Sequence, residues 1–178
     1  MGLRKLLLII PIFLYSAGCY PGITGKVVDS DTGRPIGRAL VVAQWTRSRG
    51  FGNTYHTIYK IIETETDAEG VFSLSGVYSP LVDQPNMIIY CRGYVPWRND
   101  GDFEAHYKKY IWENNKTYKL TKLNNTYSRQ MLHMFIQSGF IGSNYRDTPK
   151  FMAIRGETSD EWNDEINRKR SKAGGGGK

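Results

Sequence analysis

The stretch GITGKVVDSDTGRPIGRALVVAQW, residues 22–45, decides the fold. Its two ends, 23–29 and 39–45, are rich in the β-branched and apolar side chains that are typical of strands. Between them lie the turn residues Thr32, Gly33 and Pro35. A threonine can bond its own backbone, a glycine accepts a positive φ and a proline fixes φ, so this run predicts a turn between two strands.

Residues 107–112 suit a strand or a short helix, and four other later segments have the composition of strands: 57–66, 71–74, 86–91 and 117–123. Asp67 and Gly70 predict a turn before the second of them. The imperfect alternation of 57–66 predicts a β-bulge, the lysines of 117–123 suit an edge or closing strand, and the glycines and arginines of 47–54 suggest a loop. About seven short strands with turns between them predict a mainly β chain, folded as a seven-stranded antiparallel β-sandwich.

The pattern changes after residue 125. Residues 128–136 place apolar side chains at near-helical spacing, and Ser128 is a suitable N-cap. Residues 158–169 start with a capping residue and acids and end with lysine and arginine, as the helix dipole favours. We therefore expect the sandwich at 19–125, a C-terminal extension with one or two helices at 126–172 and a flexible glycine-rich tail at 173–178.

Residues 1–18 have the layout of a secretory signal peptide. Arg4 and Lys5 precede an apolar run at 6–15, and small residues follow it. The run is about half the length of ~20 residues that a membrane-spanning helix needs.

The end of this leader, the four residues Ser-Ala-Gly-Cys at 16–19, resembles the bacterial lipobox. The resemblance implies that the chain is cleaved before Cys19 and acylated on it. The residue after Cys19 is Tyr20 and not an aspartate, which resembles the pattern that sorts lipoproteins to the outer membrane in Gram-negative bacteria. The implied location is the outer membrane, facing the periplasm or the cell surface, with the membrane as a partner through acylated Cys19. The alternative is an ordinary cleaved signal in which Cys19 is incidental.

Cys19 and Cys91 are the two cysteines. An acylated Cys19 would leave Cys91 without a disulfide partner, whereas an oxidising compartment would permit a bond between them. Cys91 ends an apolar run, which favours a buried, inert thiol.

Four blocks carry a family resemblance: 22–29, 32–36, 39–42 and 66–72. Together they resemble the carboxypeptidase regulatory-like domain, a transthyretin-like (prealbumin-like) β-sandwich, over about residues 21–123. Within these blocks the turn residues form the turns between strands, and none of them is a chemical group directed at a substrate. We therefore interpret these residues as fold-specifying: Thr32, Gly33, Pro35, Asp67 and Gly70.

Motifs for catalysis are missing from the sequence. The chain has three histidines but no H-E-x-x-H zinc motif and no G-x-S-x-G nucleophile motif. Asp29, Asp31 and Asp67 could meet at one end of a sandwich and bind Ca²⁺, but carboxylates that cap turns are the preferred interpretation. We therefore expect no enzyme, no cofactor and no metal.

An aromatic and basic segment follows the fifth expected strand. Its candidate binding residues are Trp97, Arg98, Phe103, Tyr107, Tyr110 and Trp112. Exposed aromatic groups mark interfaces, so these side chains could stack on a glycan or contact a protein. The alternative is that several of them cover the open end of a small core.

The net charge of +7 fits either ordinary solubility or attraction to anionic lipids and glycans. Nucleic acid is not an expected partner of an exported protein. The favoured function is a membrane-anchored, non-catalytic binding or scaffolding module whose partner is an envelope protein or a glycan. The first alternative is a structural subunit that docks on a larger envelope assembly through its C-terminal segment. The second is a hydrolase with an unrecognised site.

Overall fold

The computed structural model describes residues 19–20, 22–50, 54–79, 82–101, 103, 113–124, 127–140 and 148–174. The expected signal peptide and three of the expected binding residues, Tyr107, Tyr110 and Trp112, lie outside this part of the chain. Within it, no helix is both long enough and apolar enough to span a membrane.

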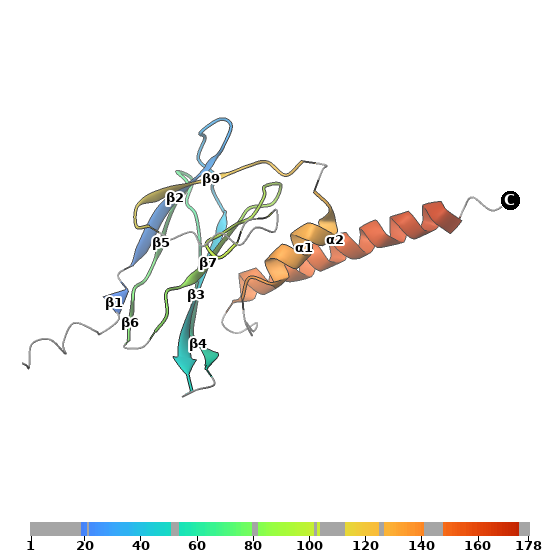
Figure 1. Cartoon of the computed structure of the whole chain (residues 1–178). Coiled ribbons are helices and arrows are strands. Elements are labelled where there is room, and N and C mark those ends of the chain that lie inside the picture. The colour runs from blue at the N-terminus through green and yellow to red at the C-terminus, as the bar shows by residue number, and fades with distance from the viewer. Residues whose placement is uncertain are drawn as a thin grey trace, which may run out of the picture.

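Two larger sheets and a short ribbon make up the β structure (Figure 1). The three-stranded sheet has the order β5–β2–β9, with β2 at Ile23–Asp29, β5 at Val71–Leu74 and β9 at Lys116–Leu120. The four-stranded sheet has the order β4–β3–β7–β8, with β3 at Leu40–Arg49, β4 at Tyr55–Glu65, β7 at Asn86–Tyr90 and β8 at Trp97–Arg98. The ribbon pairs β1, Cys19–Tyr20, with β6, Val77–Tyr78.

The mainly β class with a helical C-terminal part is confirmed, but the expectation of purely antiparallel strands is wrong. Strand β9 runs parallel to β2, from the pair Gly25–Lys116 to the pair Asp29–Leu120. The chain reaches β9 by crossing over from the four-stranded sheet, so β9 arrives in the same direction as β2. A parallel pair needs such a crossover, because a tight hairpin can join only antiparallel strands.

The first core lies between the two larger sheets. Its fully buried large side chains include Trp45, Phe72 and Tyr118. Gly25 of β2 makes room for two of these rings, because a Cβ there would lie 2.7 Å from Phe72 and 2.8 Å from Tyr118. The glycine in the Ile-Thr-Gly-Lys run is therefore a packing requirement.

A second core lies on the outer face of the four-stranded sheet, where α1 (Arg129–Gln137) and α2 (Pro149–Gly174) cover it. Leu40 and Val42 of β3 face these helices, whereas Val41 and Ala43 face the first core. Burial on both faces explains why 39–43 is a continuous apolar run and does not alternate. The molecule therefore has three layers: sheet, sheet and helices (Figure 1).

The first helix begins where the sequence predicts it. Ser128 is the N-cap of α1, and its Oγ accepts the backbone N–H of Met131 at 3.1 Å.

The second helix begins at Pro149, well before the start predicted at Thr158. Proline suits the first turn of a helix, and the Glu63 carboxylate accepts the N–H groups of Lys150 and Phe151, both at 3.1 Å. Thr158 is buried within the helix, and its hydroxyl donates to the carbonyl of Arg155 at 3.2 Å. The cap thus comes from strand β4, which local sequence does not reveal.

The loop predicted at 47–54 is also wrong in part, because β3 and β4 stay paired as far as Arg49 and Tyr55. The register shifts between Trp45 and Thr46, which leaves Tyr59 of β4 without an opposite residue. This is the bulge expected in 57–66. The β3–β4 hairpin extends past the rest of the sandwich (Figure 1).

The first turn is closed by its own side chains. Asp29 Oδ1 accepts hydrogen bonds from the backbone of Asp31 at 3.0 Å and of Thr32 at 2.9 Å, and from the Thr32 hydroxyl at 3.0 Å. Gly33 has a φ of 68°, and Pro35 bridges to Val28 of β2. These residues hold the turn against the strand that precedes it.

The second turn packs on the first. Asp67 Oδ1 accepts the N–H of Val71 at 2.7 Å, and Gly70 has a φ of 76°. The Gly70 carbonyl accepts the N–H of Val27 at 2.8 Å, and a Cβ on Gly70 would lie 2.4 Å from the Val27 carbonyl oxygen and 3.2 Å from Pro35. The two turns therefore form one corner around β2, which only glycine permits at position 70.

Candidate functional site

Two of the expected binding residues are buried: Arg98 is 8% exposed and Phe103 6%, so these two side chains contribute little to the outer surface. The helical layer covers them, since Phe103 packs edge-on against Tyr127 and against Phe135 of α1. Trp97 is half-buried and packs edge-on against Tyr118, with ring centroids 4.7 Å apart.

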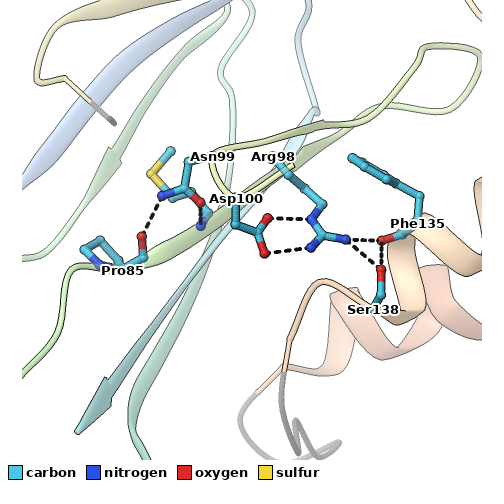
Figure 2. A network of polar contacts seen from close by, with 7 residues as sticks. Pro85, Arg98, Asn99, Asp100, Phe135 and Ser138 are labelled. Carbon is cyan, nitrogen blue, oxygen red and sulfur yellow. Dashed lines mark hydrogen bonds and ion pairs between the residues drawn. The ribbon is translucent and has the colours of Figure 1, made fainter. Parts of the chain in front are cut away.

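Arg98 joins the edge of the four-stranded sheet to the end of α1 (Figure 2). Its Nε and Nη2 donate to the two oxygens of Asp100, both at 2.7 Å. Its Nη1 donates to the carbonyl of Phe135 at 2.6 Å and to the Ser138 hydroxyl at 2.8 Å. The cation also lies 4.7 Å from the centre of the Phe135 ring.

This geometry suits arginine and no other residue. The planar guanidinium makes a two-point contact with a carboxylate and still has donors for a helix carbonyl. A cation is also favourable at the C-terminal end of α1, where the helix dipole is negative. With these contacts made, Arg98 fixes the helical layer on the sandwich and is not directed at a ligand.

The next residue, Asn99, connects in the other direction (Figure 2). It is buried, its Nδ2 donates to the carbonyl of Pro85 at 2.8 Å, and its Oδ1 accepts the N–H of Met87 at 2.7 Å. Arg98 and Asn99 are both internal connectors, although arginine and asparagine are residue types that are common on surfaces. Residue type alone does not distinguish an internal role from a surface role for Arg98 and Asn99.

A cavity of about 240 Å³ lies beside these residues, between the edge strands β8 and β9. Its lining consists of Val95, Pro96, Trp97, Arg98, Gly101, Phe103, Lys119, Leu120 and Thr121. The structure thus brings together three of the six expected binding residues: Trp97, Arg98 and Phe103. The volume lies below the ~300–1,000 Å³ typical of pockets for drug-sized ligands.

The acidic residues considered for Ca²⁺ do not form a cation site. Both oxygens of Asp29 already accept hydrogen bonds, Oδ2 from the Tyr94 hydroxyl at 3.0 Å, and Lys122 lies 3.8 Å from Oδ2. The backbone hydrogen bond from Thr32, together with those from Tyr94, the Thr32 hydroxyl and Asp31, lowers the pKa of Asp29 to about 2 against the opposing effect of burial. In the described part of the chain, no group of three or more acidic, histidine or cysteine side chains could hold a metal.

Ser48, His56 and Asp83 lie together near the β3–β4 hairpin, which is the residue set of a hydrolase triad. The Ser48 hydroxyl lies 3.3 Å from His56 Nδ1, and Asp83 Oδ2 lies 3.4 Å from the same nitrogen. A triad needs the serine and the acid on opposite nitrogens of the ring, so that the base can take a proton from the serine while the acid orients it. This set has the wrong geometry for that reaction.

His133 lies between α1 and α2. Its ring contacts that of Trp162, with centroids 4.9 Å apart, and its Nδ1 is buried without a hydrogen-bond partner in the described structure. Burial, with a smaller contribution from Arg155, lowers the pKa of His133. The histidine is therefore part of the helix interface, and its neutral form is favoured there.

No family model and no curated protein matches the chain. Among solved structures, a streptococcal ancillary pilin is 14% identical, with a TM-score of 0.33 over 60% of this chain and 30% of the pilin. A 9R-lipoxygenase from Cyanothece PCC8801 is 17% identical, with a TM-score of 0.27 over 61% of this chain and 17% of that chain. The chain thus spans less than a third of either protein, and likenesses this weak identify neither fold family nor activity.

Proposed function

We propose that this chain is a membrane-anchored envelope lipoprotein whose sandwich is a non-catalytic binding or scaffolding module. The observation that carries the proposal is the place of Cys19, which follows the leader pattern and lies in β1, paired directly with Tyr78 of β6. An acyl group on Cys19 would therefore be attached to the folded domain without a linker. Such an anchor has almost no reach, which favours partners at the same membrane.

The same proposal includes a location for the protein, which is the outer membrane of a Gram-negative cell, facing the periplasm or the cell surface. This location is supported by the lipobox-like run followed by Tyr20. The transthyretin-like fold of the carboxypeptidase regulatory-like domain belongs to the proposal as well. What supports that fold is the corner where Gly70 lies against Val27 and Pro35, and a core enclosed by sheets of three and four strands.

The absence of catalysis is supported by how the polar groups are used. Asp29 and Arg98 make their hydrogen bonds within the fold, and Ser48, His56 and Asp83 do not have triad geometry. An activity screen of the purified protein, repeated with a chelator, tests this point. Turnover that survives purification and depends on His56 would favour the hydrolase alternative.

The decisive experiment is the intact mass of the mature protein. We expect a chain that begins at Cys19 and carries acyl groups, and a Cys19→Ser variant that carries none. An unmodified chain that begins elsewhere would overturn the anchoring. Cross-linking in native membranes and retention on glycan columns then test for an envelope-protein or a glycan partner.

One observation favours the alternative of docking through the C-terminal segment. The end of α2 extends beyond the sheets (Figure 1), and four basic residues are exposed on it: Arg168, Lys169, Arg170 and Lys172. Deleting residues 168–178 removes this end and keeps the contact between His133 and Trp162. If the protein belongs to a larger assembly through this helix, native complex size falls on deletion; an unchanged size contradicts the alternative.

A further inference from the structure

The end of the sandwich that carries Cys19 also carries the β3–β4 hairpin. Cys19 is opposite Tyr78 in the β1–β6 ribbon, and the next residue, Ser79, accepts a hydrogen bond from Arg47 Nη2 at 2.7 Å. Arg47 lies in the hairpin and also bridges to Val82. The ribbon and the hairpin are therefore neighbours at one end of the molecule (Figure 1).

Exposed tyrosines gather at this end. Tyr78 is 71% exposed, Tyr55 57% and Tyr59 40%, and Ile58 beside them is 38% exposed. A tyrosine has an apolar ring and a polar hydroxyl, which suits the boundary between lipid and water. Elsewhere on the described surface, the large apolar side chains exposed to this degree are Val71, Met131 and Met134, none of them aromatic.

The same hairpin carries basic side chains. Arg49 is directly opposite Tyr55, Lys60 follows Tyr59, and the Arg47 cation lies 4.5 Å from the centre of the Tyr59 ring. One acid, Asp83, lies among them and accepts hydrogen bonds from Thr46 and Ser48. Basic groups alternating with tyrosines match a layer of anionic lipid headgroups in both charge and polarity.

We propose that the β3–β4 hairpin, together with Tyr78, is a docking surface for a bilayer that contains anionic lipid. The proposal rests on the anchoring of Cys19, which places this end of the sandwich at the membrane. Acyl chains alone hold a protein at a bilayer but leave its orientation free. The docking surface is a second membrane signal that turns the domain to one orientation, with the hairpin in the headgroup layer.

A second copy of the chain is a less suitable occupant of this surface. Strand β4 is the edge of its sheet, and an exposed edge can pair with another strand. The bulge at Tyr59 distorts this edge strand, and Lys60, which lies on it, would meet a like charge from an identical edge paired about that position. Bulges and charges are the devices that discourage edge pairing.

Depth measurement on the acylated full chain tests the proposal. A spin label is placed at Tyr55→Cys, with Cys91→Ala to remove the other thiol, and the protein is reconstituted in vesicles that contain phosphatidylglycerol. The matched control carries the label at Glu69→Cys, in the exposed turn at the opposite end. We expect the label at 55 to be accessible to oxygen and shielded from a water-soluble nickel chelate, and the label at 69 to show the reverse. Equal exposure of both labels to nickel would overturn the docking surface.

Vesicle binding without acylation separates this proposal from the anchoring. A Cys19→Ser chain is expected to sediment with phosphatidylglycerol vesicles at low salt and to be released by high salt. Arg49→Glu with Lys60→Glu should weaken binding at least tenfold, because one basic group near an anionic surface is worth roughly fivefold in affinity. Arg34→Glu with Arg38→Glu, which makes the same change in charge at the other end, should have a much smaller effect.

The outcomes are distinct. An acylated protein whose position 55 is water-exposed keeps the anchoring and overturns the docking surface. If the unsubstituted protein is found to carry no acyl groups and its hairpin still binds anionic vesicles, the docking surface stands and the anchoring is overturned. Disulfide-linked dimers through Tyr55→Cys, with no vesicle binding, would assign the hairpin to a second copy and overturn the proposal.

Discussion

The Tyr94 hydroxyl donates a 3.0 Å hydrogen bond to Asp29 Oδ2, across 65 residues of sequence. The bond joins the turn after β2 to the segment that precedes β8, where Tyr94 also bridges to Lys122. Three distant parts of the chain thus meet at one carboxylate. Asp29 has the sequence position of a turn-capping residue, but it also holds the two larger sheets together at this end.

Removing this hydroxyl in Tyr94→Phe should raise the pKa of Asp29 from about 2 toward its ordinary value of 3.8, because the carboxylate loses a donor. A carboxyl with a lowered pKa stabilises the fold above its unfolded pKa, and this stabilisation is lost as the pH falls through the folded pKa. The variant should therefore lose less stability between about pH 4 and about pH 2. An NMR titration of Asp29 and urea midpoints across this range measure both effects. Tyr78→Phe, at an exposed tyrosine, is the control and should leave both unchanged.

Gly70→Ala should be much more damaging than Gly33→Ala. Both glycines have a positive φ, which costs an alanine about 1–2 kcal/mol. A Cβ at position 70 would also lie 2.4 Å from the Val27 carbonyl oxygen, whereas nothing lies within 4 Å of one at position 33. We expect a loss of at least about 3 kcal/mol for Gly70→Ala and about 1–2 for Gly33→Ala in urea unfolding. Equal losses would show that the corner adapts.

Arg98→Met should loosen the helical layer. It leaves the Phe135 carbonyl and Asp100 without their guanidinium. Because Arg98 is buried but Asp100 is 34% exposed, we expect a loss of about 2–3 kcal/mol. Hydrogen exchange of α1 should increase more than that of β2. Arg129→Met, which removes an exposed ion pair with Glu161, is the matched control and should cost about 1 kcal/mol or less. Unchanged protection of α1 in Arg98→Met would contradict the role of this arginine.

His133 makes the helix pair sensitive to acid. Its pKa is lowered from 6.5, so the folded state binds the proton less tightly than the unfolded chain does. Stability should be greatest above about pH 6.5 and should fall as the pH decreases through the folded pKa. His133→Phe, which keeps a ring against Trp162, should reduce the change in urea midpoint between about pH 8 and about pH 5.

The strands and turns of the first half could be predicted from sequence because their signals are local. Gly33 and Gly70 mark turns by their residue type, and Ser128 marks the start of α1 in the same way. The parallel pairing of β9 with β2 could not be predicted, because it depends on where a long crossover returns. The start of α2 depends on Glu63, which lies in another element.

The candidate site was harder to predict for a related reason. Arg98 and Phe103 are residue types that serve equally well at an interface and in a core. The continuous apolar run of β3 indicated a covering layer, because a sheet with one wet face alternates. Combined with the apolar face of 128–136, it could have placed Arg98 beneath the helices. The exposed hairpin carried no such signal, since residues 47–54 have the composition of an ordinary loop.

The contact between Glu63 and the start of α2 sets an order of assembly. The carboxylate is made and folded into β4 some 87 residues before Lys150. Synthesis proceeds from the N-terminal end, so the strands are made before the helices that cover Leu40, Val42 and Ile88 on the outer face of the sheet. Until the helices are made, this apolar face of the nascent protein is exposed and prone to aggregation. A chaperone that binds exposed apolar surface would act on that face until α2 closes over it.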